Sequence, residues 1–328
     1  MPQGAVRIEA FQSAERRMRR EGALVRGNSD MGKPGFVLGA RPGGRRETIA
    51  TAKWLDERGF SHVYCPTFGD GMSLSLAVVM ETSQLKVGTG IANIYTRHPA
   101  SMAETAAFMH ELSEGRFLMG LGVSHAPTND ALGVQTGKPL ADIRSYVERM
   151  REAALGEALP PIILATLRKR MVGLAAEISE GALWAQGVLS HMGASLEAVP
   201  EGKRDAFLVG NLAPCAVSDD RNLALTAVRR GLRMYMTLPN YQNYFIEAGY
   251  ESEVEAARAA VADGDMGAVL EAISEEMADD IGLFGTAAQV RDKVDAWAAA
   301  GVEEMTLSAV STTGNQAQAI EEVAAIFD

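Results

Sequence analysis

The stretch KVGTGIANIYTRHPASMAETAAFMHELSEGRFLMGLGVSH (residues 86–125) decides the fold. It starts with an apolar, glycine-containing run at 86–94, which is typical of a buried strand. Pro99 then opens a helix that ends at Gly115, since proline is well tolerated at a first helical position. The apolar run 116–123 is a second strand. A strand, a helix and another buried strand predict two parallel strands joined by a right-handed crossover.

The same alternation continues on both sides of this stretch. The predicted strands are 35–40, 62–68, 86–94, 116–123, 161–167, 182–187, 206–218 and 302–310. The predicted helices are 47–60, 72–83, 99–115, 142–155, 170–181, 286–301 and 315–327. Eight such units predict an α/β fold, namely a (β/α)₈ TIM barrel, with a helical insertion before the last strand. A doubly wound open sheet is the alternative that this pattern leaves open.

The chain divides unevenly. Residues 1–34 are charged and are predicted to form an N-terminal extension, either a surface helix or a mobile arm. Residues 35–328 are predicted to form a single barrel domain, which is within the size range of this fold. No apolar run has the length of a signal peptide or of a membrane span.

Composition excludes several classes of partner. The net charge is −11 and the isoelectric point about 5.1, so nucleic acid and anionic membranes would repel the chain. The two cysteines, Cys65 and Cys215, stand far apart and suggest neither a disulfide framework nor a zinc site. A cytoplasmic location is therefore expected.

Side chains that follow the strands are the candidates for the site, because barrel active sites lie at the carboxyl ends of the strands. These candidates are Asn93, Tyr95, Thr96, Arg97, His98, Ser124, His125, Asn129, Thr166, Arg168, Lys169, Arg170, Trp184, Gln186, Asn211, Cys215, Ser308, Ser311 and Thr312. Hydroxyls, amides and a few cations dominate this set, whereas carboxylates and metal-ligand spacings are missing. No metal is expected. Such a set suits a planar, phosphate-bearing cofactor that brings its own reactivity.

Several of these features have a second interpretation. Gly88 and Gly90 could simply permit close packing inside the barrel. Arg97 could be a structural arginine that ties the loop to the next helix. The aromatic segment 233–245 either forms a wall of the substrate pocket or packs as part of a helix beneath a lid.

Residues 86–125 resemble the luciferase-like flavin-dependent oxidoreductases, which include bacterial luciferase and the deazaflavin-dependent reductases and dehydrogenases. The shared pattern is a strand, a TRHP loop, a helix ending LSEGRF, and then GLGVS. The resemblance continues in PIILATLRKRMVGLAAEISEGALW (161–184) and in GTAAQVRDKVDAWAAAGVEEMTL (285–307).

The resemblance implies a barrel that binds the deazaflavin coenzyme F420, or else FMN, at its carboxyl face. It implies a cis peptide bond at Gly90–Ile91 behind the ring and an amide contact from Asn93 to the edge of the ring. The cofactor tail would then lie along Gly122, Val123 and Ser124. Its phosphate would lie near Thr166, Leu167 and Gly181. The family usually has glycine in the turn after the fifth strand, and here Arg168 would supply charge instead.

These implications lead to one predicted function and two alternatives. The predicted enzyme is a luciferase-like oxidoreductase that uses F420 for hydride transfer to or from a small organic substrate, and that forms a homodimer. The first alternative is an FMN-dependent monooxygenase served by a separate flavin reductase. The second is a non-catalytic flavin-binding barrel. The catalytic residues are unknown, because the end of the first strand, LGARPGG (38–44), contains no His, Asp or Glu.

Overall fold

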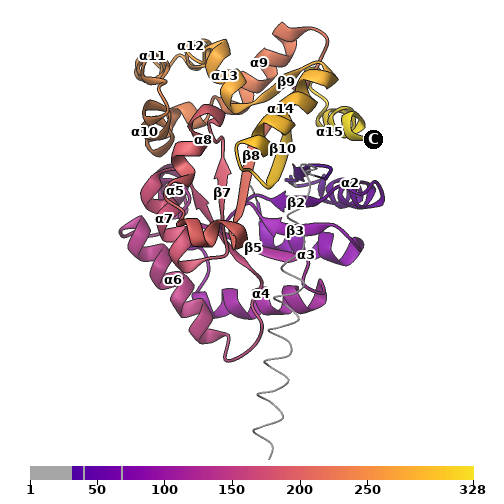
Figure 1. The fold of residues 1–328 in the computed structure, drawn as a ribbon, viewed down its shortest axis with the longest axis vertical. Helices are drawn as coiled ribbons and strands as arrows, with labels where there is room; N and C mark the ends of the chain where they lie inside the picture. Colours follow the sequence, from indigo (N-terminus) through magenta and orange to yellow (C-terminus); the bar gives the residue numbers. More distant parts are fainter. Residues whose placement is uncertain (1–31, 40, 68) are drawn as a thin grey trace, which may run out of the picture. The chain divides into compact units, whose positions relative to one another are not determined.

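The computed structural model describes residues 32–39, 41–67 and 69–328, all within one compact unit (Figure 1). Its strands are β1 (Gly35–Val37), β2 (His62–Cys65), β3 (Lys86–Thr89), β4 (Ala92–Asn93), β5 (Phe117–Gly122), β6 (Ile162–Thr166), β7 (Gly181–Ala185), β8 (Leu208–Val217), β9 (Leu283–Gly285) and β10 (Glu304–Ala309). The predicted extension, residues 1–34, lies almost wholly outside the described residues.

The strands close into a parallel barrel. They follow one another in chain order from β1 to β8, and β10 pairs with both β8 and β1. The third strand position of the barrel is filled by two short strands, since β3 and β4 both pair with β5. The predicted barrel is therefore confirmed, and the open sheet is wrong. The peptide bond Gly90–Ile91 between the two pieces is cis, as the resemblance implied.

The helices are α2 (Arg45–Glu57), α3 (Gly71–Glu81), α4 (Pro99–Leu112), α5 (Ala126–Ala131), α6 (Pro139–Ala153), α7 (Lys169–Ile178), α8 (Leu189–Leu196), α9 (Arg221–Leu232), α10 (Pro239–Glu247), α11 (Glu251–Ala262), α12 (Met266–Glu271), α13 (Glu275–Ile281), α14 (Ala287–Ala299) and α15 (Gln316–Ala324). Pro99 is the first residue of α4, and the side chain of His98 accepts a hydrogen bond from the Ala100 N–H as its N-cap. A capping box formed by Thr286 and Gln289 begins α14. Sequence signals for helix starts were therefore reliable here.

The predicted helical insertion lies between β8 and β10. It contains α9 to α13, which gather in one part of the molecule (Figure 1). It also contains β9, which pairs with Cys215–Val217 at the far end of β8. A strand of three residues leaves too short a pattern to be predicted from periodicity.

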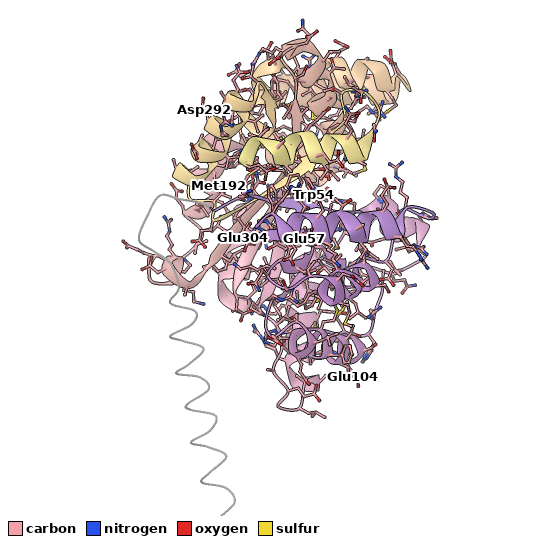
Figure 2. All side chains as sticks on the ribbon, turned by 90° about the vertical axis from the view of Figure 1, so that its right-hand side faces the viewer. Trp54, Glu57, Glu104, Met192, Asp292 and Glu304 are labelled. Atoms are coloured by element: carbon pink, nitrogen blue, oxygen red, sulfur yellow. The ribbon has the colours of Figure 1, made fainter. Side chains whose placement is uncertain are left out.

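The amino end of the barrel is closed by polar side chains. Glu304, labelled in Figure 2, is 7% exposed and accepts hydrogen bonds from the Tyr64 hydroxyl at 2.7 Å and from Lys86 Nζ at 3.3 Å. His62 Nε2 lies 2.7 Å from Thr306 Oγ1. Above this network, an apolar layer fills the barrel with Tyr64, Leu118, Ile163, Leu183 and Leu212. This end is plugged, so a ligand can enter only from the carboxyl end.

Candidate functional site

The carboxyl end of the barrel is lined by small side chains. Inward positions alternate along each strand. The lining above the apolar layer takes residues from several strands and from the turn between β3 and β4. These residues are Val37, Ile91, Gly122, Ala165, Ala185 and Ser308. All of them except Gly122 are half-buried, whereas the layer below is buried. This lining is mostly apolar, and we call these six residues the bowl.

Glycine is required at the side of this bowl formed by β4 and β5. A Cβ atom at Gly122 would lie 2.7 Å from the Ile91 side chain and 3.0 Å from the Ala165 Cβ. A Cβ atom at Gly90 would lie 2.9 Å from the Tyr64 Cβ. Close packing of neighbouring strands thus accounts for both glycines, and it also keeps the floor of the bowl free of side chains.

Unpartnered polar atoms gather around the mouth. Seven buried side-chain nitrogen or oxygen atoms of the described residues lack a hydrogen-bond partner, and four of these belong to strands β5 to β8 or to the residues just after them. The four are His125 Nδ1, Thr166 Oγ1, Gln186 Oε1 and Asn211 Nδ2. Thr166, Trp184 and Asn211 pair in register, so Asn211 lies level with the end of β6. Because a buried polar group without a partner is costly, this concentration indicates a ligand site.

The segment 233–245 packs against residues that follow β5 and β7, and its role as a wall of the substrate pocket stays a prediction. Tyr244 and Phe245 are fully buried, and the Tyr244 hydroxyl accepts a hydrogen bond from the Val188 N–H, as expected for helix packing. Tyr241, in contrast, lies with its ring centre 5.7 Å from that of His125 and 4.7 Å from that of Tyr235. These two tyrosines thus extend the barrel wall.

Asn93 is held by other protein groups. Its Nδ2 donates to Asn129 Oδ1 at 2.9 Å, and its Oδ1 accepts from the Tyr95 N–H at 3.1 Å. Asn129 in turn donates to the Val123 carbonyl. This chain of amides ties β4 to the turn after β5, where Ser124 has a positive φ of 56°. Asn93 therefore positions Val123 and Ser124, and its predicted contact with a ring stays a prediction.

The turn after β6 offers free backbone donors. Arg168 is the N-cap of α7, but its side chain makes no capping hydrogen bond to that helix. It pairs instead with Glu247, and Lys169 pairs with Glu197. The first N–H groups of α7 therefore have no side-chain partner, and Thr166 with its unpartnered hydroxyl immediately precedes the turn. Such a helix start attracts an anion.

Gly181 does not belong to this turn. It is the first residue of β7 and pairs with Ile163, whereas Thr166 pairs with Trp184 three residues further along the strand. At about 3.3 Å per residue, this places Gly181 roughly 10 Å below Thr166, toward the amino end of the barrel. The structure thus brings Ile91, Gly122 and Thr166 to the carboxyl end, but leaves Gly181 away from it.

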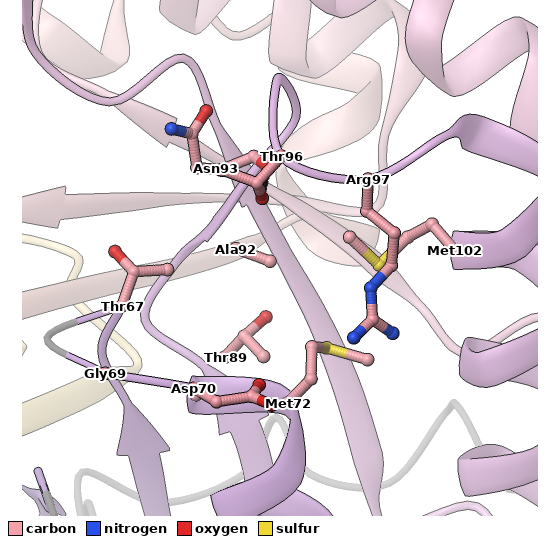
Figure 3. Close-up of a pocket in the computed structure, with 11 residues that line it drawn as sticks. Thr67, Gly69, Asp70, Met72, Thr89, Ala92, Asn93, Thr96, Arg97 and Met102 are labelled. Atoms are coloured by element: carbon pink, nitrogen blue, oxygen red, sulfur yellow. Dashed lines mark hydrogen bonds between the residues drawn. The ribbon is translucent and has the colours of Figure 1, made fainter. Parts of the chain in front are cut away.

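A small pocket lies beside the mouth, between the ends of β2 and β3 (Figure 3). It encloses about 80 Å³, and its polar residues are Thr67, Asp70, Thr89, Asn93, Thr96 and Arg97. The guanidinium of Arg97 points into it and donates to Thr105 Oγ1 of α4. Burial raises the pKa of Asp70, but hydrogen bonds from Ser73 and the charge of Arg97 lower it overall. Arg97 is therefore a structural arginine that joins this loop to α4.

The side chains along the wall are uncharged. Burial lowers the pKa of His125 and therefore favours its neutral form at pH 7. Burial also raises the pKa of Tyr241 well above its ordinary value and raises that of Tyr235, so both hydroxyls keep their protons. This wall can exchange hydrogen bonds with a ligand but offers no fixed charge.

The described part of the chain contains neither a metal-binding cluster nor a membrane-spanning helix. No group of three or more His, Cys, Asp or Glu side chains is arranged to hold a metal ion there. Within the same residues, no helix has both the length and the apolar character that crossing a bilayer would need.

The fold is a (β/α)₈ barrel, and its candidate ligand site lies at the carboxyl end. The sequence model of the luciferase-like monooxygenases matches residues 32–304, which is most of the chain. The protein therefore belongs to the luciferase-like monooxygenase family and is an oxidoreductase.

Individual relatives agree with this assignment. A 5,10-methylenetetrahydromethanopterin reductase of Archaeoglobus fulgidus is 26% identical over 71% of this chain and 79% of its own length. A putative coenzyme F420-dependent oxidoreductase of Mycobacterium tuberculosis is also 26% identical, over 70% of this chain and 80% of its own. The structure of the coenzyme F420-dependent tetrahydromethanopterin reductase from Methanopyrus kandleri superposes with a TM-score of 0.71, covering 89% of this chain and 97% of that one at 21% identity.

Proposed function

We propose that the protein binds the deazaflavin coenzyme F420 at the mouth of its barrel and catalyses hydride transfer to or from a small organic substrate. The observation that carries this proposal is the concentration of unpartnered polar atoms around a bowl of small side chains. The similarity to an oxidoreductase named as F420-dependent supports the choice of coenzyme. When bound, the coenzyme would supply a hydride-accepting and hydride-donating ring carbon.

The residues present fit both ends of such a coenzyme. Ile91, Gly122 and Ala165 lie together, and a planar ring would rest against them, because Gly122 leaves no side chain between the other two. The free N–H groups at the start of α7 and the Thr166 hydroxyl can bind a phosphate. Val123, Ser124 and Leu167 would line the tail between these two ends.

The chain's own residues would then hold the substrate and exclude water. The segment 233–245 covers one side of the mouth, so a substrate lying over the ring would be shielded from solvent on that side. Orientation of donor and acceptor is the protein's main contribution to such a reaction. A homodimer in the cytoplasm remains our proposal for the working form, with a small molecule as its substrate.

A titration of the purified protein with F420 and with FMN, followed by fluorescence quenching, tests the proposal. We expect F420 to bind more tightly. Tighter binding of FMN would favour the monooxygenase alternative, which the name of the family also supports and which requires a separate flavin reductase. Binding of neither coenzyme would contradict the proposal and favour a non-catalytic barrel.

A further inference from the structure

Four side chains form a continuous wall along one side of the mouth. His125 follows β5, Gln186 follows β7, and Tyr235 and Tyr241 come from the segment above them. The ring of His125 lies against that of Tyr241, which lies against that of Tyr235. The Gln186 side chain lies close enough to Tyr235 to lower the pKa of its hydroxyl, against the larger rise that burial causes. We call these four residues the aromatic wall.

The two ends of the aromatic wall carry unsatisfied hydrogen-bonding atoms. Gln186 is only 5% exposed, and its Oε1 has no partner. The Nδ1 atom of His125 is also buried and has no partner. β5 and β7 are separated by one strand, so their ends lie about 10 Å apart. That span matches a small organic molecule, and an amide oxygen without a partner calls for a hydrogen-bond donor.

Between these two ends the aromatic wall is apolar and uncharged. Tyr235 and Tyr241 are neutral aromatic side chains, Tyr241 being only 4% exposed, and the bowl below offers Ala165 and Ala185. A carboxylate or phosphate on the substrate would find no cation among the four wall residues. Burying such a charge without a partner is far more costly than burying a neutral hydroxyl that is hydrogen-bonded.

We infer that the aromatic wall is the substrate subsite and that it selects a neutral molecule with a hydroxyl group on an apolar body. Gln186 Oε1 accepts the hydrogen bond of that hydroxyl, and His125 provides the second polar contact. This inference rests on the proposed function, because it names the substrate class of the same mouth. It assigns Gln186 and His125 as residues that determine specificity.

Three probes that share a six-membered carbon ring test the inference: cyclohexanol, cyclohexanone and cyclohexanecarboxylate. Binding to the full chain is measured by ligand-observed nuclear magnetic resonance, with and without the coenzyme. We expect cyclohexanol to bind about tenfold more tightly than cyclohexanone, which cannot donate to Gln186, and the carboxylate to bind most weakly.

Matched variants identify the side chains that bind the hydroxyl of the probe. Gln186→Leu removes the acceptor at similar volume, and His125→Phe keeps a ring against Tyr241 but removes both nitrogens. Each should weaken cyclohexanol binding about tenfold, and Gln186→Leu should also abolish the preference for alcohol over ketone. The control is His110→Phe, because His110 on α4 also has an unpartnered Nδ1 and a pKa lowered by burial. This control should bind all three probes as the unaltered protein does.

Two results would overturn the inference. One is unchanged cyclohexanol binding in both Gln186→Leu and His125→Phe. The other is a carboxylate that binds as tightly as the alcohol. Failure of the proposed function would be seen separately, as an absence of F420 and FMN binding. In that case the probe titrations without coenzyme would still decide whether the aromatic wall selects a hydroxyl.

Discussion

Arg168, the N-cap of α7, forms an ion pair with Glu247, the last residue of α10 and 79 positions further along the chain. Nε of Arg168 donates to Oε1 of Glu247 at 2.8 Å. The two side chains are 51% and 39% exposed, so the pair stabilises the fold by at most about 1 kcal/mol. Glu247 thus holds the guanidinium beside the turn where we propose the coenzyme phosphate.

Substitution of Arg168 and substitution of Glu247 should change coenzyme affinity in opposite directions. Arg168→Ala should weaken binding by about 1.5–3 kcal/mol if it removes one charge-assisted hydrogen bond. Glu247→Gln should strengthen binding, because it removes a carboxylate that competes with the phosphate. Fluorescence titration with the intact coenzyme and with a version that lacks the phosphate measures both effects. An equal loss for both ligands in Arg168→Ala would show that Arg168 does not bind the phosphate.

Ala165→Leu should block the floor of the bowl. Ala165 lies beside Gly122, and its side chain points to the mouth, so a larger side chain would occupy the place of the ring. We expect coenzyme binding to weaken by about 1–3 kcal/mol, the usual cost of overpacking. The control is Ala262→Leu at the exposed end of α11. Calorimetric titration measures both variants, and equal affinities would place the ring elsewhere.

His62 should make folding stability depend on pH. Burial lowers the pKa of His62 below its ordinary value of 6.5; Glu304 opposes this shift and Lys86 adds to it. As the pH falls, the His62 side chain therefore takes up a proton at a higher pH in the unfolded chain than in the folded chain. The resulting stability is complete above pH 6.5 and is lost as the pH falls through the folded pKa.

The test compares denaturant unfolding of the protein and of His62→Gln between pH 7.5 and pH 5. The slope of the unfolding free energy against pH should be shallower in the variant, by at most about 1.4 kcal/mol per pH unit, which corresponds to one proton. His110 and His125 are present in both proteins and cancel in the comparison. Identical slopes would mean that His62 does not remain neutral in the fold.

The proposed homodimer has a candidate surface on α3 and α4. Met80 is 62% exposed and Phe108 is 59% exposed, on two helices that pack side by side. Large apolar side chains exposed together are typical of an interface. Phe108→Glu should shift the protein toward monomer in sedimentation velocity, whereas Leu155→Glu, at an isolated position that is 92% exposed, should not. A protein that is already monomeric would contradict the proposed homodimer.

Much of the fold could be predicted because its signals are local. Pro99 at the start of α4 and the capping box of α14 each act within a few residues. The three-residue strand β9 could not be predicted, because it forms only against the far end of β8. For the same reason the sequence could not predict the height of Gly181 in the barrel, since that height depends on which residue of β6 lies opposite it.

The sequence by itself determined the alternation of strands and helices, and with it a parallel sheet covered by helices, whereas the tertiary structure decided that this sheet closes into a barrel. It also singled out Thr166, His125 and Gln186, because they follow strands. Only the tertiary structure decided their partners: Tyr241 beside His125, Tyr235 beside Gln186, and Glu247 beside Arg168. The physical reason is that backbone preferences depend on near neighbours, whereas a side chain's partner comes from a distant part of the chain that packing brings close.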